Sequence, residues 1–229
     1  MTIKLLAIES ATDVCSVALR INEHSKQKLA LQPRIHSELI LPMVDELLTE
    51  AGIELKQLDA IAFGCGPGSF TGLRIASAMV QGLAFGSSLP VVAVSSLAVL
   101  AQTAMRKHGI EHLVTAIDAR MKEIYWAVYS KNKQGLMTLN GQETVCMPEE
   151  AILDAENVTT GVGNGGVYFE VFKSRNPQLI DWRLDCVPEA IDLLDLAEAE
   201  YFQGRCLEPD QAAPVYLREA TNWKKLPGR

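Results

Sequence analysis

Short apolar runs separated by polar turns mark the strands expected in the first half of the chain. Residues 3–8 (IKLLAI) form one run, and residues 14–19 (VCSVAL) alternate after the polar stretch ESATD, so together they predict a β-hairpin. A third strand is expected near residues 28–31. The runs at 58–63 (LDAIAF) and 90–94 (PVVAV) predict two further strands, the second of them buried.

Three stretches with apolar residues at helical spacing lie between or after these strands. Residues 37–51 predict a helix with Ser37 as N-cap, although Pro42 then requires either a start just before it or a kinked first turn. Residues 73–85 are rich in alanine and predict a largely buried helix. Residues 95–107 predict a third helix, capped by one of the two serines at its start.

The pattern starts again near residue 113. An apolar run at 113–118 ends in an acid, a polar turn follows, and residues 123–129 form a second run, which repeats the strand, acid, turn and strand of the first hairpin. Because hairpins are common, this repeat alone does not establish a duplicated fold. A strand at 157–161, a short helix at 165–174 and a helix at 189–203 are expected to complete a smaller second half.

The composition limits what the chain can bind by itself. Its 21 Lys and Arg residues against 28 Asp and Glu give a net charge of −7, so any contact with nucleic acid is expected to depend on a partner. Five scattered cysteines without a CxxC pair argue against a disulfide framework and a cysteine zinc site. The N-terminus lacks a signal-type apolar run, and no stretch approaches the roughly 20 apolar residues of a membrane helix, so we expect a cytoplasmic protein.

The most glycine-dense stretch is FGCGPGSFTGLR at 63–74, between a predicted strand and a predicted helix. It lacks the lysine of a Walker A loop and the GxSxG order of a nucleophile elbow. Two interpretations stay open: an anion site at the next helix, capped by Ser69 or Thr71, and a purely structural tight turn. The GVGNGG stretch at 161–166 matches GxGxxG but lacks the following strand and acid of a dinucleotide fold, so we expect a glycine turn near a hinge cleft.

Candidate metal ligands and catalytic carboxylates are few. His108 and His112 have helical spacing, but Gly109 lies between them, so we expect solvated histidines at a helix end and no metal site. Asp118 ends a predicted buried strand and is the one carboxylate whose placement suggests chemistry. A role in capping its own hairpin is the alternative.

Five stretches of the chain carry a family resemblance: IESATDVCSVAL, RIHSELILPMVDELL, LDAIAFGCGPGSFTGLRI, PVVAVSSLAVLA and PVYLRE. They are similar to the TsaB (YeaZ) family of bacterial tRNA threonylcarbamoyladenosine biosynthesis factors, closely over about 3–130, thinly over 131–205 and again in the tail. The resemblance implies an α/β, actin-like ATPase (ribonuclease H-like) fold with two similar subdomains, each with a mixed β-sheet and packed helices. We expect them at 1–105 and 106–205, with a tail at 206–229 that packs back on the N-terminal subdomain.

The function that the resemblance implies depends on where this chain differs from the related catalytic subunit, TsaD. TsaD-like proteins carry a metal-binding HxxxH motif where this chain has Ser96 and Leu100, so no metal is expected there. The resemblance implies a non-catalytic scaffold that binds TsaD, together with the ATPase TsaE. The complex would transfer threonylcarbamoyl to the adenosine next to the anticodon of tRNAs that read codons starting with A. No cofactor is expected, and tRNA would be reached only through the complex.

The alternative is an active small-molecule kinase or ATPase of the same superfamily, with Asp118 near the phosphates. A nucleotide site, which the resemblance leaves unknown, has the candidates Ser10, Thr12, Gly68 and Asp118. The helices at 37–51 and 72–85 carry more apolar residues than one core-facing stripe requires, and in the family they contact TsaD or, without it, form a homodimer. The interface residues expected from them are Leu39, Met43, Leu47, Arg74, Ala78 and Met79. The basic tail residues are expected to be solvated rather than bound to tRNA: Arg218, Lys224, Lys225 and Arg229.

Overall fold

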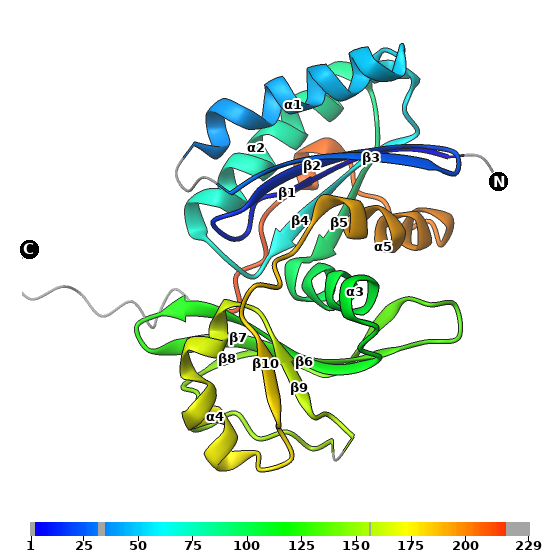
Figure 1. Ribbon diagram of the computed structural model, residues 1–229. Coiled ribbons are helices and arrows are strands. Elements are labelled where there is room, and N and C mark those ends of the chain that lie inside the picture. The colour runs from blue at the N-terminus through cyan, green and yellow to red at the C-terminus, as the bar shows by residue number, and fades with distance from the viewer. Residues whose placement is uncertain (1–2, 32–34, 156, 219–229) are drawn as a thin grey trace, which may run out of the picture.

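The computed structural model describes residues 3–31, 35–155 and 157–218, which fold into two lobes, each built around a five-stranded sheet (Figure 1). The first sheet contains β1 (Lys4–Glu9), β2 (Cys15–Ile21), β3 (His24–Ala30), β4 (Ala60–Gly66) and β5 (Val91–Ser95). The second contains β6 (His112–Arg120), β7 (Glu123–Lys131), β8 (Met137–Cys146), β9 (Thr160–Val162) and β10 (Asp181–Arg183). The α-helices of the described residues are α1 (His36–Ala51), α2 (Phe70–Ser87), α3 (Ser96–His108), α4 (Phe169–Arg175) and α5 (Ala190–Phe202).

The two sheets have the same strand order. The first has the order β3-β2-β1-β4-β5, with β1 antiparallel to β2 and parallel to β4. Read from its opposite edge, the second has the matching order β8-β7-β6-β9-β10, with β6 antiparallel to β7 and parallel to β9. Each lobe therefore repeats one topology, which confirms the duplication that the second hairpin suggested. Two such mixed sheets with packed helices form the actin-like ATPase (ribonuclease H-like) fold.

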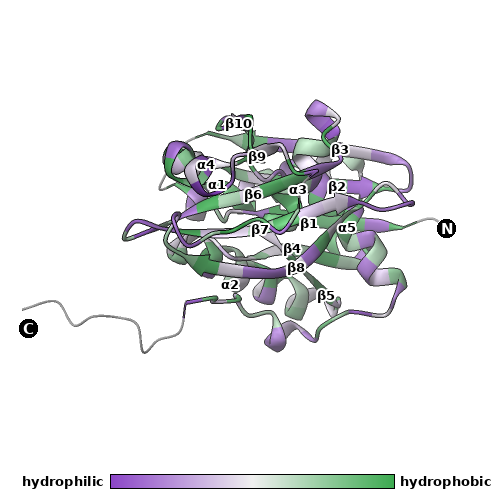
Figure 2. Ribbon diagram, turned by 90° about the horizontal axis from the view of Figure 1, so that it is seen from below, coloured by the Kyte–Doolittle hydropathy of each residue, from purple (hydrophilic) through white to green (hydrophobic). Residues whose placement is uncertain are grey.

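Both faces of each sheet are covered, because successive side chains of a strand point to opposite faces. On β1, Leu6 and Ile8 pack toward α1 and α2, whereas Leu5 and Ala7 pack toward α5. Strand β6 alternates in the same way between α3 and the α4 side. Figure 2 shows apolar residues along the central strands and hydrophilic ones in the outer turns. The layers are therefore α1 with α2, the first sheet, α5 with α3, the second sheet and α4 (Figure 1).

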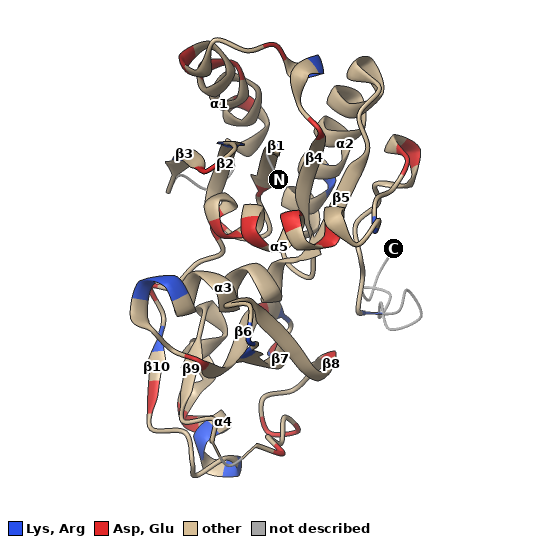
Figure 3. Ribbon diagram, turned by 90° about the vertical axis from the view of Figure 1, so that its right-hand side faces the viewer, with Lys and Arg blue, Asp and Glu red and all other residues tan. Residues whose placement is uncertain are grey.

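Helix α5 packs on the first sheet, although its place in the sequence predicted that it belongs to the second half. Its buried Leu193 and Leu194 belong to the core beneath β1 and β4. Arg106 of α3 forms ion pairs with residues at the start of α5. Its Nε lies 2.6 Å from Asp192 Oδ1, and its Nη2 lies 2.9 Å from Glu189 Oε2. Acidic residues of α5 lie beside α3 in Figure 3. The two helices thus form a middle layer between the sheets, while the subdomain limits at 105 and 205 stay predictions.

The predicted helix starts are partly corrected. Helix α1 begins directly after Ile35, which offers no side-chain cap, so Ser37 lies inside the first turn and the N-cap prediction was wrong. Pro42 lies well inside α1, rather than near its start. Its ring is exposed, so the carbonyl that loses its N–H partner can bond water instead. The N-cap of α2 is Ser69 rather than Thr71, and that of α3 is Ser95 rather than Ser96.

Some elements differ from their predicted extent. Strands β8 and β10 were not predicted, because β8 is a largely exposed, polar edge strand and β10 has three residues. The predicted helix at 165–174 is a 3-10 turn over Asn164–Tyr168 followed by α4. The third strand, expected near 28–31, already begins at His24.

The described part of the tail, 206–218, packs on the first lobe, where Leu207 forms an isolated bridge with Val91 and Ala212 is buried. Arg218 was expected to be solvated, and this was wrong: its side chain is largely buried and pairs with Glu123 of the second lobe. The other basic tail residues, Lys224, Lys225 and Arg229, lie outside the described residues. None of the helices in the described ranges is long and apolar enough to cross a membrane.

Candidate functional site

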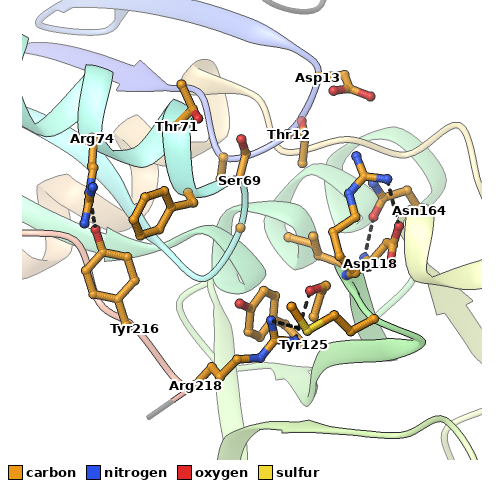
Figure 4. Close-up of a pocket in the computed structure, with 17 residues that line it drawn as sticks. Thr12, Asp13, Ser69, Thr71, Arg74, Asp118, Tyr125, Asn164, Tyr216 and Arg218 are labelled. Carbon is orange, nitrogen blue, oxygen red and sulfur yellow. Dashed lines mark hydrogen bonds and ion pairs between the residues drawn. The ribbon is translucent and has the colours of Figure 1, made fainter. Parts of the chain in front are cut away.

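A cleft of about 820 Å³ opens between the two lobes (Figure 4). Its first-lobe wall consists of the β1–β2 turn at 11–13 and the N-terminal end of α2. Its second-lobe wall consists of the β6–β7 turn and Asn164. Tyr216 and Arg218 of the tail line it as well. The cleft is thus built from the two repeated hairpins, the glycine-dense loop and the tail.

The structure brings three of the four nucleotide candidates together. Thr12, Gly68 and Asp118 all line the cleft. Ser10 does not, since it is fully buried and its hydroxyl donates a hydrogen bond to the carbonyl oxygen of Gly72 at 2.9 Å. Ser10 therefore fixes the start of α2 against the first hairpin, and the nucleotide site itself stays a prediction.

The glycines of the 63–74 loop permit close contact with the β1–β2 turn. A Cβ atom at Gly72 would lie 2.0 Å from the carbonyl oxygen of Ser10, and one at Gly68 would lie 2.4 Å from that of Ala11. Real Cβ atoms essentially never approach a heavy atom closer than 3.0 Å, so neither position accepts a side chain unless the backbone moves. Of the two interpretations left open by the sequence, this contact favours the structural turn.

A buried carboxyl group at the end of β1 was missed in the sequence analysis. Glu9 has no exposed surface, and it accepts hydrogen bonds from the Ala11 N–H at 2.7 Å and from the Ser96 hydroxyl at 3.1 Å. A Cβ on Gly64 beside it would lie 1.9 Å from Glu9 Oε2, so a side chain at position 64 would displace this carboxyl group. Burial raises the pKa of Glu9 to about 7, although its hydrogen bonds act in the opposite direction. The only sequence signal was an acid at the end of an apolar run.

Asp118 caps its own hairpin, which was the alternative to a chemical role. Its Oδ1 accepts the N–H of Arg120 at 2.9 Å, and its own N–H donates to Asn164 Oδ1 at the same distance. The turn residues Arg120, Met121 and Lys122 have φ angles of 62°, 56° and 65°, a region that side-chain-bearing residues rarely occupy. The capping bonds therefore stabilise an unusual turn at the mouth of the cleft.

An aromatic and cationic cluster forms the cleft wall next to the tail (Figure 4). The guanidinium carbon of Arg74 lies 3.6 Å from the centre of the Phe70 ring, and Arg74 Nε donates to the Tyr216 hydroxyl at 3.0 Å. The Phe70 and Tyr216 rings lie 5.7 Å apart, centre to centre. Sequence reasoning did not connect these residues, and the PVYLRE stretch was the only signal that could have found Tyr216.

The predicted interface residues lie at different depths on α1 and α2. Arg74 and Ala78 are exposed, and the half-buried ones are Leu39, Met43 and Met79. Leu47 is only 1% exposed and belongs to the core between α1 and the first sheet. Its side chain therefore stabilises the subunit and offers no surface in this structure.

Ser96 and Leu100, the two positions compared above with a metal-binding motif, are both fully buried. Ser96 donates to Glu9, and Leu100 packs in the core beneath α3. His108 and His112 are both exposed, and His112 Nδ1 lies 2.9 Å from the Ser130 hydroxyl. Within the described ranges, no group of three or more His, Cys, Asp or Glu residues is placed to hold a metal ion.

The GVGNGG stretch accommodates a tryptophan. A Cβ at Gly161 would lie 2.2 Å from the Trp182 ring, and one at Gly166 would lie 2.1 Å from it. The indole N–H donates to the carbonyl oxygen of Gly163 at 2.8 Å. These glycines therefore serve packing in the second lobe, and the stretch borders the cleft only through Asn164.

Comparison with known proteins gives the chain a family. A family model described as TsaD, tRNA N6-adenosine threonylcarbamoyltransferase, matches residues 27–168. The chain is 41% identical to the tRNA threonylcarbamoyladenosine biosynthesis protein TsaB of Haemophilus influenzae over 98% of both chains, and 41% identical to that of Escherichia coli over 99% of both. The solved structure of YeaZ from Pseudomonas aeruginosa is 45% identical, with a TM-score of 0.89 over 93% of this chain and 99% of that one. The chain therefore belongs to the family that the TsaD model describes and, within it, to the group of proteins named TsaB.

Proposed function

We propose that the protein is a non-catalytic subunit that binds a TsaD-type catalytic subunit in tRNA threonylcarbamoyladenosine biosynthesis. The names of its relatives support the pathway. The replacement of the metal-binding histidines by Ser96 and Leu100 supports a role without catalysis. In this proposal TsaD transfers threonylcarbamoyl to the adenosine next to the anticodon, a TsaE-type ATPase completes the assembly in the cytoplasm, and tRNA contacts the chain only through the complex.

The observation that carries the proposal is the largely apolar exposed stripe of α2, together with the exposed Leu41 on the neighbouring helix α1. Leu41 is 47% exposed and Phe85 is 80% exposed. Along α2, the exposed stripe has its smallest residues, Ala78 and Gly82, between Arg74 and Phe85. Small residues let a partner helix approach closely, and the apolar side chains beside them gain free energy when they leave water. Without its partner, we expect the protein to form a homodimer through the same face.

Replacing Ala78 by glutamate is expected to weaken binding to the TsaD-type subunit of the same organism about 50-fold or more, because the new charge would be buried at the centre of the contact. Isothermal titration calorimetry measures this affinity. The control is Val171→Glu, which places the same charge at a 42% exposed apolar site on α4 and should leave the affinity unchanged. An Ala78→Glu variant that binds as well as the unaltered protein would contradict the proposal.

The second candidate function, an active small-molecule kinase or ATPase, is favoured by the cleft. Thr12, Gly68 and Asp118 line a volume that can hold a nucleotide, next to the N-terminal end of α2, where the helix dipole favours an anion. This hypothesis requires that the purified protein binds Mg²⁺–ATP and releases phosphate, and that Asp118→Asn abolishes the release. The scaffold hypothesis requires neither, so a phosphate-release assay separates the two.

A further inference from the structure

The last described residues, 207–218, form a strap that starts on the first lobe (Figure 1). Its first residue pairs with Val91 on edge strand β5 through two backbone hydrogen bonds of 2.8 and 2.9 Å. Farther along, the carbonyl oxygen of Ala212 accepts hydrogen bonds from Ser77 at 2.5 Å and from Gln81 at 3.0 Å, both on α2. The strap is therefore anchored to two elements of the first lobe before it reaches the cleft.

The strap then crosses the glycine-dense loop. The N–H of Val215 donates to the carbonyl oxygen of Cys65 at 2.8 Å, and a Cβ on Gly66 would lie 2.9 Å from the Val215 carbonyl oxygen. Tyr216 follows and accepts the hydrogen bond from Arg74 described above. Strap, loop and α2 thus form one continuous wall of the cleft on the first-lobe side.

Arg218 joins this wall to the second lobe. Its guanidinium donates to the carbonyl oxygen of Ala119 at 3.0 Å and forms an ion pair with Glu123, so it binds both sides of the β6–β7 turn. The Arg218 side chain is only 13% exposed, which shields the pair from solvent more than an ordinary surface ion pair. Among the described residues, every hydrogen bond from the strap to the second lobe comes from this side chain.

The other connection between the lobes is broader and runs through α3 (Figure 1). Helix α3 packs against strands of both sheets. At its start, Ser95 donates to Glu143 of β8, which also accepts the Tyr129 hydroxyl of β7. Two bodies joined by one broad packed contact and by one single side chain separate most easily at the single side chain.

We infer that residues 207–218 are an interlobe clasp. The clasp is anchored on the first lobe, and Arg218 fastens it to Glu123 and the Ala119 carbonyl. Release of Arg218 lets the second lobe turn about the α3 connection and widens the cleft. This inference concerns the opening of the cleft and does not depend on what the protein binds.

Spin labels on the two outer helices report the separation of the lobes. Asp45 on α1 and Glu170 on α4 are exposed and can be replaced by cysteine in a background with Cys146→Ser and Cys206→Ser, since the other three native cysteines are buried. Double electron–electron resonance then gives the distribution of distances between the labels in the full-length chain. Hydrogen–deuterium exchange of the β6–β7 turn gives an independent measure.

Arg218→Ala is expected to move the label distances to longer values with a broader distribution, and to speed amide exchange in the β6–β7 turn about ten-fold or more, because charge-assisted bonds to that turn are lost. The control is Arg120→Ala. It also removes an arginine at the β6–β7 turn, but the Arg120 side chain is 81% exposed. The exchanged pair Arg218→Glu with Glu123→Arg should recover most of the closed distribution. An unchanged distribution in Arg218→Ala, or an equal change in Arg120→Ala, would overturn the inference.

Discussion

Replacing Gly72 by alanine is expected to lower the free energy of unfolding by about 3 kcal/mol, at the upper end of what overpacking in a core costs. The added methyl group would lie 2.0 Å from the carbonyl oxygen of Ser10. That oxygen belongs to a backbone fixed in the first hairpin, and Gly72 belongs to α2, so neither side can give way alone. Urea unfolding followed by circular dichroism measures the change.

The matched control lies in the same helix. Gly82→Ala places the same methyl group where nothing lies within 4 Å, so it should stabilise the isolated protein by up to about 1 kcal/mol through helix propensity. The two substitutions are therefore expected to have opposite signs. If Gly72→Ala were as well tolerated as Gly82→Ala, the contact between the loop and the first hairpin would not be the reason for glycine at that position.

Local sequence patterns predicted the elements whose burial follows a simple rule. Strands β1 and β4 are buried on both faces and were visible as apolar runs, and the hairpin β6–β7 repeated a recognisable pattern. Strand β8 reads MTLNGQETVC, and its mostly polar residues reflect an exposed edge rather than a loop. Helix α5 was found, but its partner sheet was not, because an apolar helix face does not specify which of two similar sheets it covers.

The candidate site was predictable only where its contacts are local. The cap of α2 by Ser69 follows from residues next to each other in the sequence. The need for glycine at position 72 arises from Ser10, which lies 62 residues earlier, and no local pattern records that contact. The same holds for Tyr216 and Arg74, which meet across 142 residues. Chain topology places these groups together, so only the structure reveals the cleft wall.

The buried Glu9 should make the stability of the protein depend on pH. Burial raises its pKa from 4.5 to about 7 in the folded state. Below pH 4.5 the group is protonated in both states and its contribution to stability is fully present. As the pH rises toward 7 and beyond, the unfolded chain ionises more readily than the folded one, so this contribution is lost. A pKa difference of about 2.5 corresponds to a loss of about 3 kcal/mol by pH 8.

Glu9→Gln should remove this pH dependence, because the amide has nearly the same shape and stays neutral. Its oxygen can still accept the Ala11 N–H, and its NH₂ group can donate to the Ser96 hydroxyl. We therefore expect similar free energies of unfolding for both proteins near pH 4.5, and a variant more stable by about 3 kcal/mol at pH 8. Urea unfolding at a series of pH values measures the difference between the two free energies of unfolding. Groups that titrate in the same way in both proteins do not contribute to this difference.

Ser96→Ala provides the control in the opposite direction. Its hydroxyl bonds the ionised form of Glu9 and lowers the pKa of that group, so its loss should raise the pKa further, which extends the fall of stability to higher pH and makes it larger. A difference between the unaltered protein and Glu9→Gln that stays constant from pH 5 to 8 would contradict a neutral Glu9. In that case the carboxylate would be ionised inside the fold, and its charge would have to be balanced at the start of α3, where Ser96 begins the helix.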